Sequence, residues 1–291
     1  METLVFFPQW LETYSRFAIE SRILGCKLIT NSLIGATSED YFKLKGKELL
    51  DFIRQNNQNL RQRWIKLIDK SEIKYFPPLD LPKITVFCPL YAGQQYIEGF
   101  LKSMQEQTIF DQCELIIIDA NSPENESQYI EEFMKEHENV IYKRLDYRAS
   151  VMETENMAIH MATGEFFAQA CVDDRHHREY LEIMSKHLHY HEDIDLVYTD
   201  CLQTKKPNET VETNSSAGDY YEHSRNEFSP ENMIKCLPGP MPMWKLSVHE
   251  KCGYFDEGLS YAGDWDIFLR MVAAGSKFKK IDIPLGLYYF N

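Results

Sequence analysis

The chain has 291 residues, of which 44% are hydrophobic and 13% aromatic, so it can bury a large core and is not intrinsically disordered. Its formal net charge of −14 and its pI near 5.1 exclude the basic surface typical of nucleic-acid-binding proteins. The sequence has no run of roughly 18 apolar residues that could span a membrane, no secretion signal, and no Cys-x-x-Cys pair. We therefore expect a cytoplasmic protein without a nucleic-acid partner, and the sequence is compatible with peripheral association at the inner face of the membrane.

Residues 1–75 are predicted to form a mainly helical extension, because apolar residues recur at helical spacing over 11–25 and 46–71. Three prolines then fall close together in 76–82, where they stop any helix. We expect this segment to be a linker that precedes a larger domain at 83–291.

Strand and helix patterns alternate along the larger domain. Strands are predicted at 83–88, 114–119, 140–144, 165–172 and 194–198, and helices near 95–107, 126–137, 151–162 and 178–190. This alternation predicts an α/β fold with a Rossmann-like, mostly parallel sheet covered by helices on both faces. Ligands of such sheets bind beyond the carboxyl ends of the strands, so we expect the site there, bordered by the polar segment 203–230.

Two adjacent carboxylates, Asp173 and Asp174, follow the strand predicted at 165–172. They can hold Mg²⁺ or Mn²⁺, which prefer hard oxygen ligands. The alternative is a turn that caps the next helix. His176 and His177 offer a mixed Asp/His metal site, but no second His or Cys cluster supports it, so we expect them to be exposed loop residues.

A third carboxylate, Asp264, lies at the start of a predicted amphipathic helix. A helix N-terminus stabilises the anionic form, which makes this side chain available as a general base. A plain helix cap is the alternative. Further upstream, Asp119 and Asn121 follow a predicted strand, where they could bind a nucleobase or ribose or simply satisfy their own turn.

Together, these segments resemble family 2 glycosyltransferases with the GT-A fold, over residues 83–290. The resemblance rests on ITVFCPLYAGQQYIEGFLKSMQEQT, ELIIIDANSPENES, ENMAIHMATGEFFAQACVDD with its DxD-like metal-binding motif, and HEKCGYFDEGLSYAGDWDIFLRM. It implies an inverting, metal-dependent enzyme that moves a sugar from a nucleotide sugar, with UDP-sugars the first candidates, to a hydroxyl of a glycan or lipid-linked acceptor. The implied role is surface polysaccharide or glycoconjugate biosynthesis.

The resemblance also implies roles for individual residues. Asp264 would be the catalytic base, and Asp174 with Asp173 would ligate Mn²⁺ or Mg²⁺. The donor-binding residues implied are Pro89, Leu90, Tyr91, Asp119, Asn121, Arg148, Asn156 and Asp173, and those on the acceptor side are Trp244, Trp265 and Asp266. Many relatives have a second Asp that contacts uracil where this chain has Ala120, so the nucleotide base is left open.

Two other classes of protein remain alternatives. The first is a non-catalytic GT-A scaffold or binding module, in which Ala120 reflects lost donor binding. The second is a nucleotidyltransferase, which would carry a Gly-rich phosphate loop where PLYAGQQY has one Gly. Residues 5–31 resemble the C-terminal edge of a GT-B glycosyltransferase domain, which implies that 1–75 is a remnant or edge of an upstream transferase domain. A homo-oligomer is the other assembly that we consider.

Overall fold

The computed structural model of the protein describes residues 3–5, 27–29, 44, 47–49, 51, 81, 83–215 and 220–290. The chain divides into two compact units, Met1–Leu79 and Asp80–Asn291. In the first unit, β1 (Thr3–Val5) pairs in parallel with β2 (Lys27–Ile29). The helix predicted at 11–25, most of the helix at 46–71, most of the linker at 76–82 and most of the GT-B-like segment lie outside the described residues.

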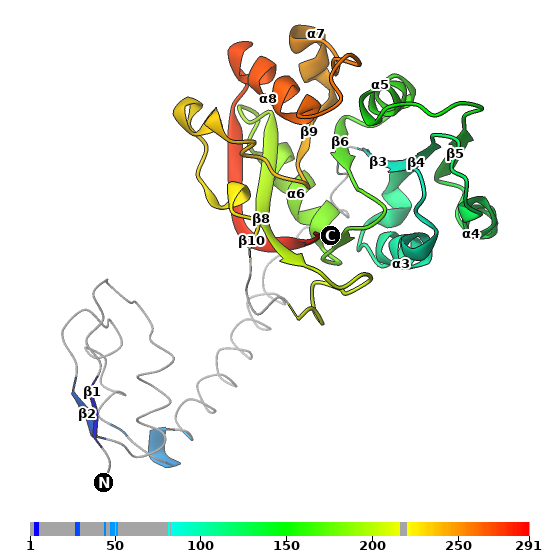
Figure 1. Cartoon of the computed structure of the whole chain (residues 1–291). Coiled ribbons are helices and arrows are strands. Elements are labelled where there is room, and N and C mark those ends of the chain that lie inside the picture. The colour runs from blue at the N-terminus through cyan, green and yellow to red at the C-terminus, as the bar shows by residue number, and fades with distance from the viewer. Residues whose placement is uncertain are drawn as a thin grey trace, which may run out of the picture. The chain divides into compact units, whose positions relative to one another are not determined.

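An eight-stranded sheet, in the order β5-β4-β3-β6-β9-β8-β10-β7, forms the centre of the second unit (Figure 1). Its strands are β3 (Ile84–Leu90), β4 (Cys113–Asp119), β5 (Val140–Arg144), β6 (Phe166–Gln169), β7 (Arg175–His176), β8 (Leu196–Thr204), β9 (Met243–Lys245) and β10 (Phe278–Tyr289). Only β7 and β9 run against the others among these strands. The predicted mostly parallel α/β sheet is confirmed.

Helices cover both faces of this sheet, as predicted. They are α3 (Gln94–Gln105), α4 (Glu126–Met134), α5 (Val151–Met161), α6 (Tyr180–Tyr190), α7 (His249–Cys252) and α8 (Gly263–Ala273). In Figure 1, α3 and α4 lie on one side of the sheet, and α5, α7 and α8 lie on the other. Ser150 precedes α5, and its hydroxyl accepts a hydrogen bond from the Glu153 amide and so caps the helix.

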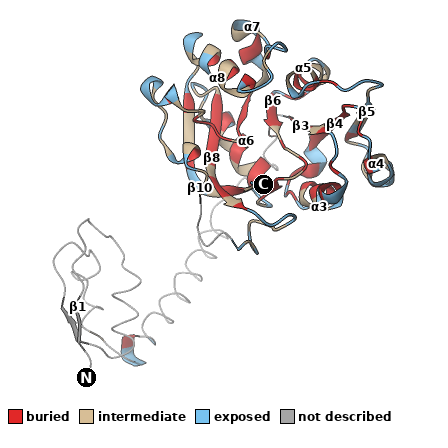
Figure 2. Cartoon of the chain, in the orientation of Figure 1, coloured by how far each residue is buried: buried red, intermediate tan, exposed pale blue. Residues whose placement is uncertain are grey.

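The core lies between the sheet and its helices (Figure 2). Strand β4 is buried along its whole length, which fits a strand that is covered on both faces and therefore reads as a continuous apolar run. The ring of Phe167 lies 6.1 Å from that of Phe87 and 5.1 Å from that of Trp244, measured between centroids. These rings join β3, β6 and β9 across the centre of the sheet.

Three strand ends differ from the prediction, and all three differences arise from pairing between distant segments. Strand β3 continues through Pro89 to Leu90 because its parallel partner β4 continues beside it to Asp119. Strand β6 ends at Gln169, so a turn, rather than the strand, leads into Asp173. Strand β8 runs on to Thr204 because it pairs with the last strand, β10.

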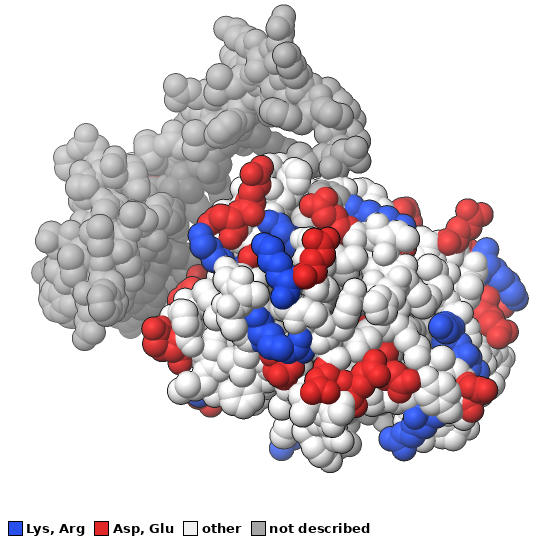
Figure 3. Space-filling view, turned by 90° about the horizontal axis from the view of Figure 1, so that it is seen from above, with Lys and Arg blue, Asp and Glu red and all other residues white. Residues whose placement is uncertain are grey.

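The surface of the second unit carries both signs of charge. On the face seen in Figure 3, Lys and Arg side chains are interspersed among Asp and Glu side chains. None of the helices in the described part of the chain is both long enough and apolar enough to cross a bilayer.

Candidate active site

A cavity of about 740 Å³ opens at the carboxyl ends of β3, β4 and β6. This volume is within the range of small-molecule sites. Seven of the predicted site residues line it: Pro89, Leu90, Tyr91, Arg148, Asp173, Asp174 and Asp264. The structure thus brings the paired carboxylates and the distant Asp264 to one cavity.

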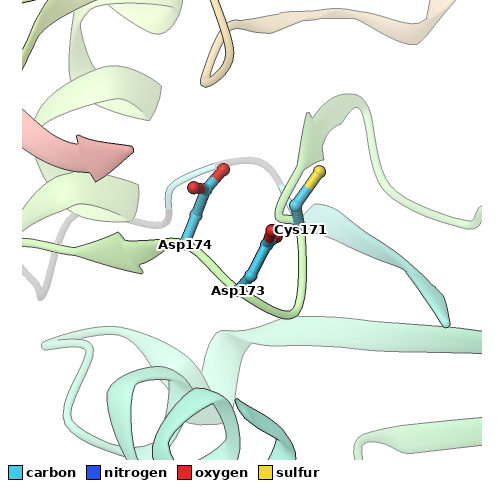
Figure 4. Close-up of side chains that lie close together, drawn as sticks. All are labelled: Cys171, Asp173 and Asp174. Atoms are coloured by element: carbon cyan, nitrogen blue, oxygen red, sulfur yellow. The ribbon is translucent and has the colours of Figure 1, made fainter. Parts of the chain in front are cut away.

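One end of the cavity is formed by the loop between β6 and β7, which carries a group of potential metal ligands. The side chains of Cys171, Asp173 and Asp174 point to the same side of this loop (Figure 4), and their potential ligand atoms all lie within 4.8 Å of one another. Asp174 is buried, and its Oδ1 accepts a hydrogen bond of 2.9 Å from the Tyr289 amide. Its Oδ2 is also buried, but has no hydrogen-bond partner among the described residues. A buried, unpartnered carboxylate oxygen is suited to a cation.

The ligand chemistry of this cluster favours the two carboxylates over the thiol. Burial raises the pKa of Asp174 well above its usual value, and the Asp173 carboxylate raises it further. Burial also raises the pKa of the Cys171 thiol, as do the two nearby carboxylates. Mg²⁺ and Mn²⁺ prefer hard oxygen ligands to sulfur, so Asp173 and Asp174 fit such an ion better than Cys171.

Arg175, which had no predicted role, holds the turn that carries these carboxylates. Its guanidinium is buried and donates hydrogen bonds to the carbonyl oxygens of Val172 at 3.0 Å, Asp174 at 2.5 Å and Tyr96 at 3.0 Å. It also bonds to the Asn208 side chain. One planar donor group thus holds three backbone carbonyls, which fixes the turn that carries the carboxylates.

Tyr91 and Arg148 form the exposed edge of the cavity. The Arg148 guanidinium lies 4.0 Å from the centre of the Tyr91 ring, and it also donates a 3.3 Å hydrogen bond to the Tyr91 hydroxyl. The loop after β3 is tied to the turn after β4 because Gly93 N and the Ser122 hydroxyl both donate to Glu126 Oε1, at 2.6 and 2.7 Å. This edge is therefore held in place by buried hydrogen bonds.

Asp119 and Asn121 do not line the cavity. The Asp119 carboxylate is fully buried and already bonded, because Oδ1 accepts from Ser122 N at 2.6 Å and Oδ2 accepts from Tyr142 and Arg144 at 2.7 Å each. Asn121 has a left-handed backbone with a φ of 61°. These contacts shape the turn, and its Ala120 is the residue that faces the cavity.

Asn156 is likewise occupied within the chain. Its Nδ2 donates to the Phe255 carbonyl and to Glu257, at 2.9 Å each, and its Oδ1 accepts from the Phe255 amide at 2.9 Å. Asn156 therefore joins α5 to the segment that precedes α8, and it does not line the cavity.

Asp264 also lines the cavity, and it lies in the first turn of α8. It is half-buried, and its Oδ2 accepts a 3.4 Å hydrogen bond from the Cys236 thiol. Ala262, in a left-handed conformation with a φ of 57°, turns the chain into this helix. The carboxylate thus lies where the helix N-terminus stabilises a negative charge.

The residues predicted for the acceptor side lie elsewhere. Trp244 is fully buried in the core, so its side chain has no surface to offer an acceptor. Trp265 donates to the Met233 carbonyl at 2.8 Å, and Asp266 pairs with Arg270 at 2.7 Å. The cavity wall near Asp264 is formed instead by Leu259, Ser260, Tyr261 and Ala262.

Sequence reasoning missed Tyr261, although a signal was present. Its side chain is 88% exposed and lines the cavity three residues before Asp264. An aromatic residue with no place in the helical pattern of α8, next to a candidate base, is the feature that could have identified it. Tyr221 and Pro240, from the segments 203–230 and 237–244, also reach this wall.

The expectation that His176 is an exposed loop residue is wrong. His176 is buried in β7, where it pairs with β10, and its ring lies 4.6 Å from that of Tyr180 between centroids. Burial lowers the pKa of its imidazole to about 3, and the Arg175 charge contributes to this shift. Neither ring nitrogen has a hydrogen-bond partner among the described residues.

Replacing His176 with Phe is expected to reduce the decrease in the free energy of unfolding between pH 8 and pH 5. The unfolded chain binds a proton on this imidazole near pH 6.5, whereas the folded protein does not until about pH 3. The stability contribution of the neutral ring is therefore present above pH 6.5 and is lost as the pH falls towards 3, at a cost of about 2 kcal/mol by pH 5. Urea unfolding at pH 8 and pH 5 measures this slope. The exposed His189→Gln serves as the control, and an unchanged slope in His176→Phe would contradict the assignment.

A mostly parallel α/β sheet with paired carboxylates beyond its central strands is the arrangement expected of the GT-A fold. The chain itself belongs to glycosyl transferase family 2, the family that residues 85–250 match. An uncharacterized glycosyltransferase of Methanocaldococcus jannaschii is 22% identical over 205 residues, which cover 70% of this chain and 69% of that protein.

Solved structures show the same fold. Residues 1–349 of S. aureus TarS in complex with UDP-GlcNAc match with a TM-score of 0.61 and 17% identity, over 72% of this chain and 59% of theirs. The mannosyltransferase PcManGT of Pyrobaculum calidifontis, in complex with GDP-Man and Mn²⁺, matches with a TM-score of 0.57 and 19% identity, over 71% of this chain and 56% of its own. The match therefore spans less than two thirds of these structures.

Proposed function

We propose that the protein is an inverting, metal-dependent glycosyltransferase that moves a sugar from a nucleoside-diphosphate sugar to a hydroxyl of a glycan or lipid-linked acceptor. The observation that supports it is the meeting of Asp173, Asp174 and Asp264 at one cavity of the size of a ligand site. The UDP-GlcNAc and GDP-Man that the two structural neighbours bind support a nucleotide sugar as donor, and the Mn²⁺ in one of them supports a divalent cation.

In this proposal Asp264 accepts the proton of the acceptor hydroxyl, whose oxygen then attacks the anomeric carbon of the sugar. The bond from that carbon to the diphosphate oxygen breaks as the new bond forms, so the configuration inverts. Asp173 and Asp174 would hold the cation, which when bound neutralises charge on the leaving diphosphate. Tyr91, backed by Arg148, offers a ring face on which a base could stack.

The roles of the other parts of the chain are proposals of the same kind. Residues 83–291 would form the catalytic domain, and 1–75 would be an extension from an upstream transferase domain. Asp119 and Asn156 would act by holding the walls of the donor site, because their polar atoms are bonded within the chain. Surface polysaccharide or glycoconjugate synthesis at the inner face of the membrane is the setting that we propose.

A donor panel tests the proposed function. UDP-, GDP-, dTDP- and CMP-sugars are added to the full chain with Mn²⁺ or with EDTA, and thermal unfolding and release of the nucleotide are followed. At a concentration 100-fold above its Kd, the correct donor adds about 2.7 kcal/mol to the free energy of unfolding, and only with the metal. An NMR spectrum of the product reports the anomeric configuration. If no donor stabilises the protein in Mn²⁺, the scaffold alternative holds instead.

A further inference from the structure

Glu155, on α5, is a buried carboxyl group that the proposed chemistry does not use. Its exposed fraction is 1%, and neither side-chain oxygen has a hydrogen-bond partner among the described residues. It nevertheless lines the same cavity as Asp174 and Asp264. A buried polar group without a partner is costly, so its presence in a cavity wall indicates a ligand group that it bonds to.

Glu155 shares the cavity with the carboxylates at both of its ends. Burial raises the pKa of Glu155 well above its usual value, and the charge of Asp264 raises it further. Glu155 in turn contributes to the raised pKa of Cys171, whose sulfur lies within 4.8 Å of the Asp173 and Asp174 carboxylates. Glu155 thus shares one cavity wall with both groups, and burial favours the protonated form of its carboxyl group, which can donate one hydrogen bond as well as accept.

The transferred sugar must occupy this same place if the proposed function is correct. Its anomeric carbon lies between the leaving diphosphate, at the Asp173–Asp174 end, and the acceptor oxygen, at Asp264. The ring hydroxyls or the N-acyl group then fall next to the groups between those ends. We propose that Glu155 hydrogen-bonds the transferred sugar, and that it restricts the donor to sugars without a carboxylate.

The charges of the cavity wall give the second half of this proposal. Glu155, Asp173, Asp174 and Asp264 all line it, and Arg148 is the single basic residue among the described lining residues. Arg148 is already placed over Tyr91 at the exposed edge. The divalent cation of the proposed function would be engaged by the diphosphate, and Arg148 by Tyr91, so the carboxylate of a uronate would lie among acidic side chains without a free positive charge to pair with.

Calorimetry in Mn²⁺ with Glu155→Leu and Glu155→Gln tests the proposal. The probes are UDP, UDP-glucose, UDP-N-acetylglucosamine and UDP-glucuronate, together with GDP, GDP-mannose and GDP-mannuronate. We expect Glu155→Leu to lower the affinity for the preferred nucleotide sugar roughly 10- to 100-fold. The affinity for the bare nucleoside diphosphate should stay within about two-fold of the wild-type value. Glu155→Gln keeps the size and the hydrogen-bonding capacity, so its loss should be smaller. Glu153→Gln, on the same helix but outside the cavity wall, is the matched control.

Each other outcome has a distinct meaning. If both Glu155 variants lose as much affinity for the bare diphosphate as for the nucleotide sugar, Glu155 has a structural role and the inference is overturned. Wild-type protein that binds the uronate as tightly as the neutral sugar would overturn it as well. A changed pH profile of kcat with unchanged sugar affinity would mean that Glu155 acts through Asp264. Wild-type protein that binds none of these compounds in Mn²⁺ would overturn the proposed function, and this inference with it.

Discussion

Replacing Asp264 with Asn is expected to lower kcat roughly 10²- to 10⁴-fold, the usual contribution of a general base, while the affinity for the nucleoside diphosphate stays within about two-fold. The amide has the size of the carboxylate, and its oxygen can still accept from the Cys236 thiol, which lies 3.4 Å away. The helix start should therefore be preserved, whereas the group that takes the acceptor proton is lost. Initial rates with the preferred donor, and calorimetry with the diphosphate and Mn²⁺, separate these two effects.

Asp266→Asn is the matched control for this experiment. Asp266 lies in the same helical turn but is outside the cavity wall, and it pairs with Arg270 at 2.7 Å. The pair is about one third exposed, so its loss should cost at most about 1 kcal/mol of stability and leave the transfer rate intact. The reverse pattern, with transfer lost in Asp266→Asn and kept in Asp264→Asn, would assign the base to Asp266.

Replacing Asp174 with Asn is expected to stabilise the metal-free protein while abolishing its response to Mn²⁺. Burial raises the pKa of this carboxyl well above its ordinary value, so at neutral pH the folded chain either retains a proton that the unfolded chain releases or carries a buried charge. Removing that penalty should raise the free energy of unfolding at pH 7. The side-chain oxygen of the introduced Asn can still accept the hydrogen bond from the Tyr289 backbone amide, which is 2.9 Å from Asp174 Oδ1 in the wild-type protein.

The stability difference between Asp174→Asn and the wild-type protein should depend on pH. Because the pKa of Asp174 is raised in the folded protein, this residue lowers the free energy of unfolding more and more as the pH rises from about 4. As the pH falls, the unfolded chain binds the same proton and the difference disappears. The gain in stability of Asp174→Asn should therefore vanish near pH 4. Denaturant unfolding at pH 4 and pH 7, with and without Mn²⁺, measures both effects. The exposed Asp111→Asn should change neither. A variant that still gains stability from Mn²⁺ would show that Asp174 is not a ligand.

The predicted site residues that line the cavity were found from features of the nearby sequence, such as the end of a strand or the start of a helix. Asp173 and Asp174 follow a predicted strand, Pro89 and Tyr91 follow another, and the carboxyl ends of parallel strands meet at one edge of a sheet. Asp264 was found because a helix start is also a local feature. No distant contact had to be known for any of them.

The residues that were misplaced depend on pairing between distant segments. His176 is buried because β7 pairs with β10, and Trp244 is buried because β9 inserts between β6 and β8. Asp119 is occupied by Arg144 from the neighbouring strand. Glu155 escaped notice for another reason: a Glu in a helix is ordinarily a surface residue, and only the packed structure shows that it faces a cavity.

The bond between the Tyr289 amide and Asp174 Oδ1 sets the order in which the site can be assembled. The two residues are separated by 115 positions, so the carboxylate reaches its final setting only after the last strand has joined the sheet. Units with nearby contacts, such as β3, α3 and β4, can form earlier because their loops are short. A folding molecule can therefore hold its β3–α3–β4 unit before the Asp174 carboxylate has reached its final setting. The proposed cation site should accordingly be among the last parts of this unit of the chain to form.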